Sequence, residues 1–296
     1  MFNNILGNDN IKELLTNAVK NNKASHSYMF VGTEGIGKKL IAKEFAKMIL
    51  CTDENKYCGK CKSCIEFESS NNPDFKIIEP DGNSLKIEQI REFQNKVSEK
   101  PIISNRKVYI INDSDKMTTE AQNCLLKTLE EPPEFVTIIL IGSNESAFLD
   151  TIKSRCMILR FNKISDENIV KFLEENFQTK VNSQSMLEAF QGSIGKAIQL
   201  QDKQEEYEQI ETVIINLEKR DKIDTLNKAE VIYKAKEEKF KILDYINIIL
   251  LDIAKKSSKY AMCINIVEDT KRRLQSNANY DMSIDNMLLK LWEQVH

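Results

Sequence analysis

The stretch Gly32-Thr33-Glu34-Gly35-Ile36-Gly37-Lys38-Lys39 decides the fold of this chain. It follows the phosphate-loop pattern G-x-x-x-x-G-K-[ST] at every fixed position except the last. In that pattern the glycines let backbone N–H groups converge on a phosphate, and the lysine neutralises its charge. We therefore predict a degenerate phosphate-binding loop, formed by Gly32, Gly35, Gly37, Lys38 and Lys39.

The last position of the loop holds Lys39, where the pattern requires a hydroxyl group that ligates Mg²⁺. An ammonium group about 4 Å from a divalent cation is repelled by roughly 8 kcal/mol at an effective dielectric constant of 20, although a flexible lysine can swing away. The substitution argues against magnesium-dependent hydrolysis and weakens the expectation that this chain binds ATP.

Residues on both sides of the loop predict a strand, a loop and a helix in succession. Ser27 to Val31 is a short apolar strand, and apolar residues recur at helical spacing from Lys38 to Leu50. Further apolar strands alternate with helical patterns, at 75–78, 108–111, 136–141 and 157–161. Such alternation predicts an α/β fold with a parallel sheet covered by helices on both faces.

Beyond Phe161 the strand patterns stop and helical patterns continue. We expect a small helical lid over 164–203 and a helical domain over 204–296. The segment 240–254 is too apolar for a solvated helix. It should therefore lie inside a bundle, against other helices of this domain or of a partner subunit.

Composition limits the classes of function. The formal net charge of the 296 residues is −3, whereas independent tight binding of DNA normally needs a basic face. We expect any contact with DNA to be shared with partner proteins. The N-terminus lacks a secretory signal pattern, and no apolar run approaches the length of a membrane span. We therefore expect a cytoplasmic protein.

Four of the seven cysteines form a C-x6-C-x2-C-x2-C cluster, namely Cys51, Cys58, Cys61 and Cys64. In a reducing compartment such a cluster is better explained by a metal than by disulfides. Four thiolates complete the tetrahedral shell of Zn²⁺, so we predict a structural zinc site. The spacing C-x2-C-x2-C also begins the ferredoxin-type iron–sulfur pattern, but no cysteine follows three residues later. An iron–sulfur redox or sensor module is the alternative.

Several further segments are specific enough to indicate a family. They are Phe2 to Gly7, His26 to Lys38, the four-cysteine module, Asn72-Pro73-Asp74, Ile90-Arg91, Lys107 to Met117, Leu125-Leu-Lys-Thr-Leu-Glu-Glu-Pro-Pro133 and Ser154-Arg155-Cys156. Up to about Leu200 the chain resembles the clamp-loader subunits of bacterial DNA polymerase III, and among them the delta-prime type. The resemblance implies a RecA-like AAA+ domain over 1–163 with a zinc module at 51–64. It also implies a helical lid over 164–203 and an all-α collar over 204–296 that assembles a pentamer.

Departures from the ATPase pattern distinguish two types of subunit in this family. A tau/gamma-type motor would have Ser or Thr at position 39, an Asp-Glu pair after the third strand and a sensor arginine in the lid. This chain has Lys39, Asn112-Asp113 and Gly195 at those places. The resemblance therefore implies a subunit that does not hydrolyse ATP. The alternative is an ATP-hydrolysing tau/gamma-type motor that uses Lys38 with Asp113 or Asp115.

Arg155 corresponds, by resemblance, to an arginine finger that reaches the nucleotide of a neighbouring subunit. A guanidinium group is a planar, permanently charged fork suited to phosphate. From residue chemistry alone, an ion pair within the chain is the alternative. The implied function is to help load the sliding clamp onto primed DNA as part of the polymerase holoenzyme. The implied partners are a tau/gamma-type ATPase, a delta subunit and the clamp, and no polymerase activity of the chain itself is expected.

Overall fold

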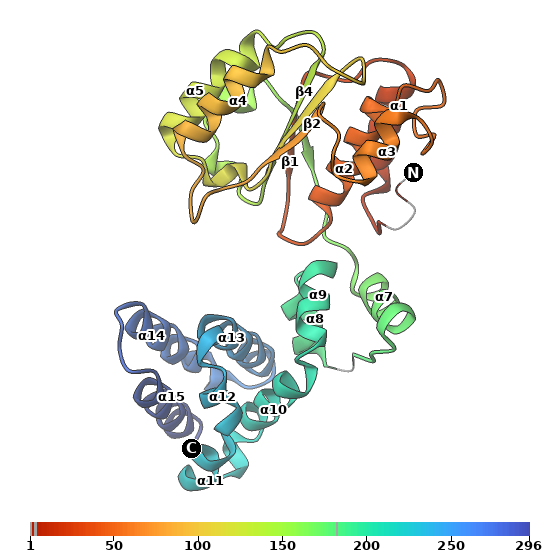
Figure 1. Cartoon of the computed structure of the whole chain (residues 1–296). Coiled ribbons are helices and arrows are strands. Elements are labelled where there is room, and N and C mark those ends of the chain that lie inside the picture. The colour runs from red at the N-terminus through yellow and green to blue at the C-terminus, as the bar shows by residue number, and fades with distance from the viewer. Residues whose placement is uncertain (1, 3–4, 182) are drawn as a thin grey trace. The chain divides into compact units, whose positions relative to one another are not determined.

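The computed structural model describes Phe2, residues 5–181 and residues 183–296. Residues 1, 3, 4 and 182, which fall in the predicted first domain and lid, lie outside the described residues. The chain folds as two compact units (Figure 1). Unit 1 comprises Met1–Ile169 with Gly192–Gly195, and unit 2 comprises Val170–Gln191 with Lys196–His296.

Unit 1 is built on a five-stranded sheet in the order β2-β3-β4-β1-β5, and every pair of neighbouring strands is parallel. The strands are β1 (Ser27–Val31), β2 (Phe75–Ile78), β3 (Lys107–Ile111), β4 (Val136–Gly142) and β5 (Met157–Arg160). The predicted parallel α/β fold is confirmed. Because β1 lies between β4 and β5, the loop that follows it leaves from the interior of the sheet, where parallel α/β folds bind ligands.

Helices cover both faces of the sheet (Figure 1). One face carries α1 (Asp9–Lys20), α2 (Lys38–Leu50) and α3 (Lys62–Glu68), and the other carries α4 (Ile87–Val97) and α5 (Thr119–Glu130). The short helix α6 (Asp150–Lys153) precedes β5. In β1 the side chains of Tyr28 and Phe30 join the core under α1 and α2, whereas Met29 and Val31 join the core under α4 and α5. Strands buried on both faces in this way read as continuous apolar runs.

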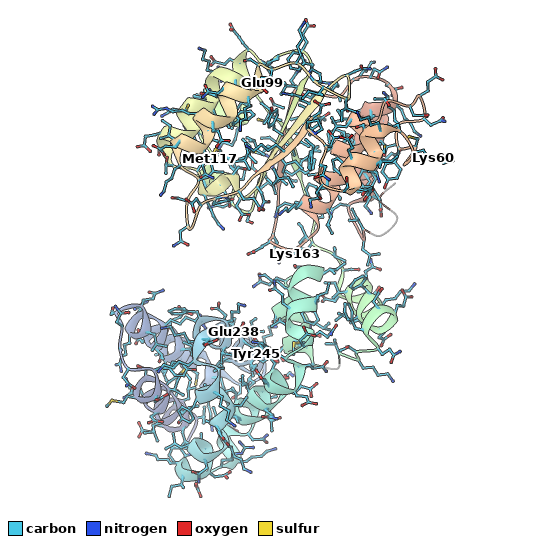
Figure 2. The ribbon with its side chains drawn as sticks, viewed as in Figure 1. Lys60, Glu99, Met117, Lys163, Glu238 and Tyr245 are labelled. Atoms are coloured by element: carbon cyan, nitrogen blue, oxygen red, sulfur yellow. The ribbon has the colours of Figure 1, made fainter. Side chains whose placement is uncertain are left out.

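Unit 2 is helical. After α7 (Asp166–Phe177), which begins in unit 1, come α8 (Gln184–Phe190), α9 (Ile194–Gln201), α10 (Gln204–Ile215), α11 (Lys222–Lys228), α12 (Glu230–Lys234), α13 (Lys239–Lys256), α14 (Cys263–Gln275) and α15 (Tyr280–Val295). The apolar segment predicted to be interior is α13, and its Tyr245 is buried against Tyr207 of α10 with ring centroids 4.7 Å apart (Figure 2). The lid and collar limits, 164–203 and 204–296, remain predictions. Among the described residues no helix is long and apolar enough to cross a membrane.

Candidate functional site

The phosphate-loop segment connects β1 to α2 with glycines at the positions that the sequence pattern requires. Gly32, Gly35 and Gly37 have φ angles of 155°, 77° and 94°, which the backbone of residues other than glycine rarely adopts. A Cβ atom on Gly32 would lie 2.7 Å from Ile36 Cδ1. The loop therefore has the backbone that such sites use, with Gly37 as the residue before α2.

Lys38 lies inside this loop at 6% exposure. Its Nζ donates to the carbonyl oxygen of Thr33 at 2.8 Å and to that of Gly32. Burial lowers the pKa of Lys38, and the negative charges of Asp115 and Glu34 oppose this shift. The ammonium group is thus bonded to the carbonyl groups of its own loop. A phosphate would have to draw it away from them.

Lys39 lies on the outer side of the loop and is held by a carboxylate. Its Nζ is 2.6 Å from Glu79 Oε1, and the Nδ2 of Asn112 donates to the same oxygen at 3.3 Å. Glu79 follows β2, Asn112 follows β3 and Lys39 begins α2, so three segments meet at the carboxyl end of the sheet. The ammonium group of Lys39 is therefore held beside Glu79 and Asn112 at this end of the sheet.

The two aspartates of the alternative motor interpretation have partners within the chain. Asp113 Oδ2 forms an ion pair with Lys116 Nζ at 3.0 Å. Asp115 Oδ2 accepts hydrogen bonds from the backbone N–H groups of Ser143 and Asn144, each at 3.0 Å. Asp115 thereby fixes the segment after β4, and neither carboxylate is left without a protein contact.

Gly195 meets the phosphate loop, a contact that sequence reasoning missed. Its N–H donates to the carbonyl oxygen of Gly35 at 3.0 Å, and both residues belong to unit 1. A Cβ atom on Gly195 would lie 2.9 Å from Gly35 Cα. With this backbone no side chain fits at position 195, so a sensor arginine could not stand there. The one signal in the sequence is the glycine itself, which we interpreted as the loss of a side chain and not as a close approach.

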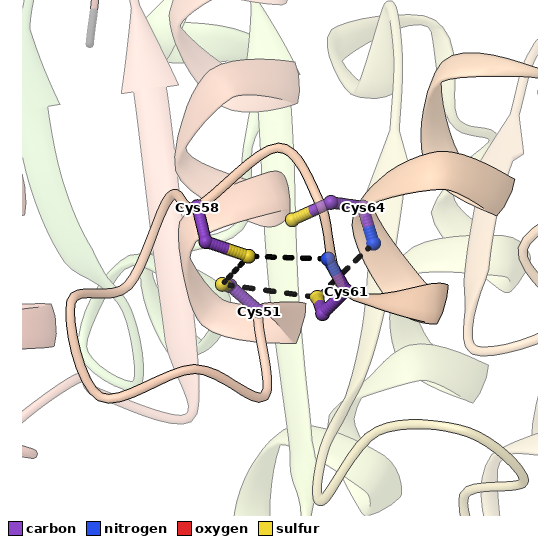
Figure 3. A group of neighbouring side chains, drawn as sticks. All are labelled: Cys51, Cys58, Cys61 and Cys64. Carbon is purple, nitrogen blue, oxygen red and sulfur yellow. Dashed lines mark hydrogen bonds between the residues drawn. The ribbon is translucent and has the colours of Figure 1, made fainter.

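The four cysteines predicted to bind a metal are brought together (Figure 3). Their sulfur atoms all lie within 4.8 Å of one another, with Cys51 Sγ 3.7 Å from Cys58 Sγ and 4.0 Å from Cys61 Sγ. A tetrahedral Zn²⁺ with Zn–S bonds of about 2.3 Å places its sulfurs about 3.8 Å apart. The spacing of the sulfurs therefore matches the shell of a single ion.

The backbone around the cysteines supports negative charge on sulfur. The N–H of Cys61 donates to Cys58 Sγ at 3.2 Å, and the N–H of Cys64 donates to Cys61 Sγ at 3.5 Å at the start of α3. Burial raises the pKa of Cys61, but hydrogen bonds from Thr52 and Cys64 outweigh it and bring the pKa to about 6. Burial and the neighbouring thiols raise the pKa of Cys64, so the four sulfurs do not share one shift. Metal binding requires thiolates, and the backbone donors to sulfur favour them.

The Asn72-Pro73-Asp74 motif attaches the cysteine module to the edge of the sheet. Asn72 Nδ2 donates to the carbonyl oxygen of Ser63, which lies next to Cys64 in α3, at 2.9 Å. Ser63 Oγ is 2.9 Å from Ser104 Oγ. Asp74, at 2% exposure, accepts the backbone N–H groups of Ile102, Ile103 and Ser104 at 2.7, 2.8 and 2.7 Å. This motif is thus a structural support for the module.

Arg155 lies between α6 and β5 with a third of its side chain exposed. Its Nη2 is 2.7 Å from Glu130 Oε1 at the end of α5. Its Nη1 donates to the carbonyl oxygen of Thr151 at 2.8 Å and to Ser154 Oγ at 3.3 Å. The ion pair of the alternative interpretation is therefore present, and the role of Arg155 as a finger stays a prediction.

The first part of the chain matches a known protein family. The model of the family described as "DNA polymerase III, delta subunit" matches residues 7–165, which is more than half of the chain. The chain belongs to this family. The match covers the sheet, the phosphate loop, the cysteine module and Arg155, so the resemblance inferred from the motifs is confirmed at the level of the family.

Relatives of two subunit types are similar to this member of the family. The delta' subunit of DNA polymerase III from Bacillus subtilis is 33% identical over 70% of this chain and 63% of that protein. The tau/gamma subunit from Haemophilus influenzae is 35% identical over 68% of this chain and 30% of that protein. The gamma/tau subunit from Mycoplasma genitalium is 28% identical over 99% of this chain and 53% of that protein. The chain thus spans less than two thirds of the length of these relatives, and the subunit type rests on the site residues.

Proposed function

We propose that this chain is a delta-prime-type subunit of the DNA polymerase III clamp loader and does not itself hydrolyse ATP. The observation that carries the proposal is the contact of Lys39 with Glu79 at 2.6 Å, at the place where a motor subunit has its Mg²⁺-ligating hydroxyl. The ion pair, together with the Asn112 amide on the same carboxylate, keeps the ammonium group near the metal position. A cation held there opposes binding of Mg²⁺.

Two further features support the same proposal. Gly195 contacts Gly35 so closely that a sensor arginine has no room, and the phosphate loop keeps Lys38 on its own carbonyl groups. The motor alternative is favoured by the intact glycines and Lys38 and by the tau/gamma relatives. Lys39 and Gly195 weigh against it, because each removes a different part of the catalytic machinery.

In the proposed assembly Arg155 acts on the ATP site of a neighbouring subunit. Its guanidinium group is at the surface, and an arginine supplied in trans can raise phosphoryl-transfer rates by about 10³ to 10⁵. The chain would then hold its place among a tau/gamma-type ATPase, a delta subunit and the sliding clamp, on primed DNA. Its helical C-terminal region would serve as the collar.

The cysteine module in this proposal holds structural Zn²⁺. Cys51, Cys58, Cys61 and Cys64 would supply four sulfur ligands and leave no open position for chemistry. The close approach of the sulfurs favours one ion over an iron–sulfur cluster, whose several irons separate the cysteine ligands further. The metal would then stabilise the segment between α2 and α3.

ATPase measurements on the chain alone and on the reconstituted clamp loader test this function. We expect the chain alone to show no turnover beyond that of its Lys38→Ala variant. In the complex, Arg155→Ala should lower the ATPase rate stimulated by clamp and DNA, and Arg155→Lys should lower it too, because a point charge cannot replace a two-pronged contact. Turnover by the chain alone that Lys38→Ala abolishes would identify a motor subunit instead.

A further inference from the structure

The two most specific motifs of the sequence meet at Arg155. Glu130 belongs to Leu125-Leu-Lys-Thr-Leu-Glu-Glu-Pro-Pro133 and is the last residue of α5, whereas Arg155 belongs to Ser154-Arg155-Cys156. Their side chains form an ion pair with Nη2 of Arg155 2.7 Å from Oε1 of Glu130. The sequence assigns no role to Glu130, and the structure places its carboxylate on the proposed finger.

The position of Glu130 is set by the core of unit 1. Helix α5 begins at the cap of Thr118, whose side chain accepts the N–H of Ala121 at 3.2 Å, and it buries Leu125 and Leu129 against the sheet. The helix ends at Glu130, just before two prolines that cannot continue it. The carboxylate therefore projects from a fixed helix end.

The guanidinium group is held from two sides. Thr151 O and Ser154 Oγ accept hydrogen bonds from Nη1, and Oε1 of Glu130 forms an ion pair with Nη2 at 2.7 Å. A guanidinium has five N–H donors, and among the described residues no acceptor takes a hydrogen bond from Nε of Arg155. The Nε side of the planar group therefore keeps donor capacity for a phosphate. Glu130 therefore need not leave when a phosphate arrives.

We propose that Glu130 is a positioning residue that holds Arg155 ready for the nucleotide of the neighbouring subunit. This rests on the proposed role of Arg155 as a finger. An arginine side chain has large rotamer freedom, which is lost when it is ordered in a complex. Because Glu130 and Thr151 order the guanidinium in the free chain, less freedom remains to be lost at the transition state.

The first arm of the test uses the full chain alone. NMR measurement of rotation about the guanidinium Cζ–Nη bonds of Arg155 should show slow rotation in the wild type and at least several-fold faster rotation in Glu130→Gln. The matched control is Glu134→Gln, which removes the same charge from an exposed residue nearby and should leave the rotation unchanged. Equal rotation rates in wild type and Glu130→Gln would overturn the proposal, since Glu130 would then not hold the group.

The second arm uses the reconstituted clamp loader. Glu130→Gln should lower kcat of the clamp- and DNA-stimulated ATPase about two- to tenfold, the range expected when one side chain must be ordered anew, with KM for ATP unchanged. In an Arg155→Ala background the same change should have no further effect, because a positioning residue has nothing left to position. A merely structural role would give additive effects and altered assembly.

The outcomes separate this proposal from the function on which it rests. If Arg155→Ala lowers the rate and Glu130→Gln does not, the finger stands and the positioning role is refuted. A higher rate in Glu130→Gln would also refute it, because Glu130 would then restrain the finger. If Arg155→Ala changes nothing, the finger itself is refuted, and the positioning role with it.

Discussion

Replacement of Asp74 should weaken the attachment of the cysteine module to unit 1. The carboxylate accepts three backbone N–H groups at 2.7–2.8 Å and is 2% exposed. In Asp74→Ala these donors lose their acceptor. Ile102 is 74% exposed, so its backbone N–H can bond to water instead, and we count only the other two bonds. At about 1.5 to 3 kcal/mol for each bond to a charged group, the expected loss in the free energy of unfolding of unit 1 is about 3 to 6 kcal/mol.

A variant that keeps one acceptor should lose less. Asp74→Asn retains one oxygen and hence at most two of the three bonds, so we expect a loss of about 1 to 3 kcal/mol. The control is Asp81→Ala, which removes an exposed carboxylate of the same unit and should stay within about 0.5 kcal/mol of the wild type.

Hydrogen exchange at the β3 amides in increasing urea reports the free energy of unfolding of unit 1, because β3 lies inside the sheet of this unit. The single tryptophan, Trp292, belongs to unit 2, so its fluorescence provides an internal reference whose transition should not shift. Since Ser104 Oγ contacts Ser63 of α3, the variant should also release bound metal to a chelator faster. A loss below about 1 kcal/mol in Asp74→Ala, with native exchange elsewhere, would refute the reasoning that these bonds anchor the module.

Two further predictions concern the metal and the response to pH. Metal analysis of the purified protein should find roughly one zinc per chain, and the Cys64→Ser variant should lose it. Hydrogen exchange of residues 51–70 should then become faster, while the amides of β1 and β3 stay protected. Iron and sulfide in the purified protein would contradict the zinc assignment. Burial raises the pKa of Tyr109, Tyr207, Tyr260 and Tyr280 from 10.0 to about 12. The folded state therefore favours the neutral phenols, so the stability present below pH 10 should fall as the pH rises from 10 to 12. Phenolate absorbance and circular dichroism, measured together, would show this loss. A phenolate titration centred at pH 10 in the folded protein would contradict the prediction.

The local elements of unit 1 follow from the sequence. The strands at Ser27–Val31 and Phe75–Ile78 and the helix Lys38–Leu50 were predicted to the residue, because an apolar run or a helical repeat between glycines and prolines leaves little choice of backbone. The cysteine quartet is likewise readable, since its four members lie within 51–64 and the spacing itself brings sulfurs together.

The tertiary structure alone decided which distant residues meet. Lys39 forms an ion pair with Glu79, the backbone of Gly195 lies close to that of Gly35, and Arg155 forms an ion pair with Glu130. Each pair joins segments that no periodicity links, because contacts across a parallel sheet depend on strand order and the positions of helix ends. From the sequence, Lys39 marked only the absence of a hydroxyl group and Gly195 only the absence of an arginine. Glu130 belonged to a motif in which it had no assigned role. The fold brings Lys39 into an ion pair with Glu79, Gly195 into a close backbone contact with Gly35, and Glu130 into an ion pair with Arg155, since side-chain chemistry acts only where the backbone places it.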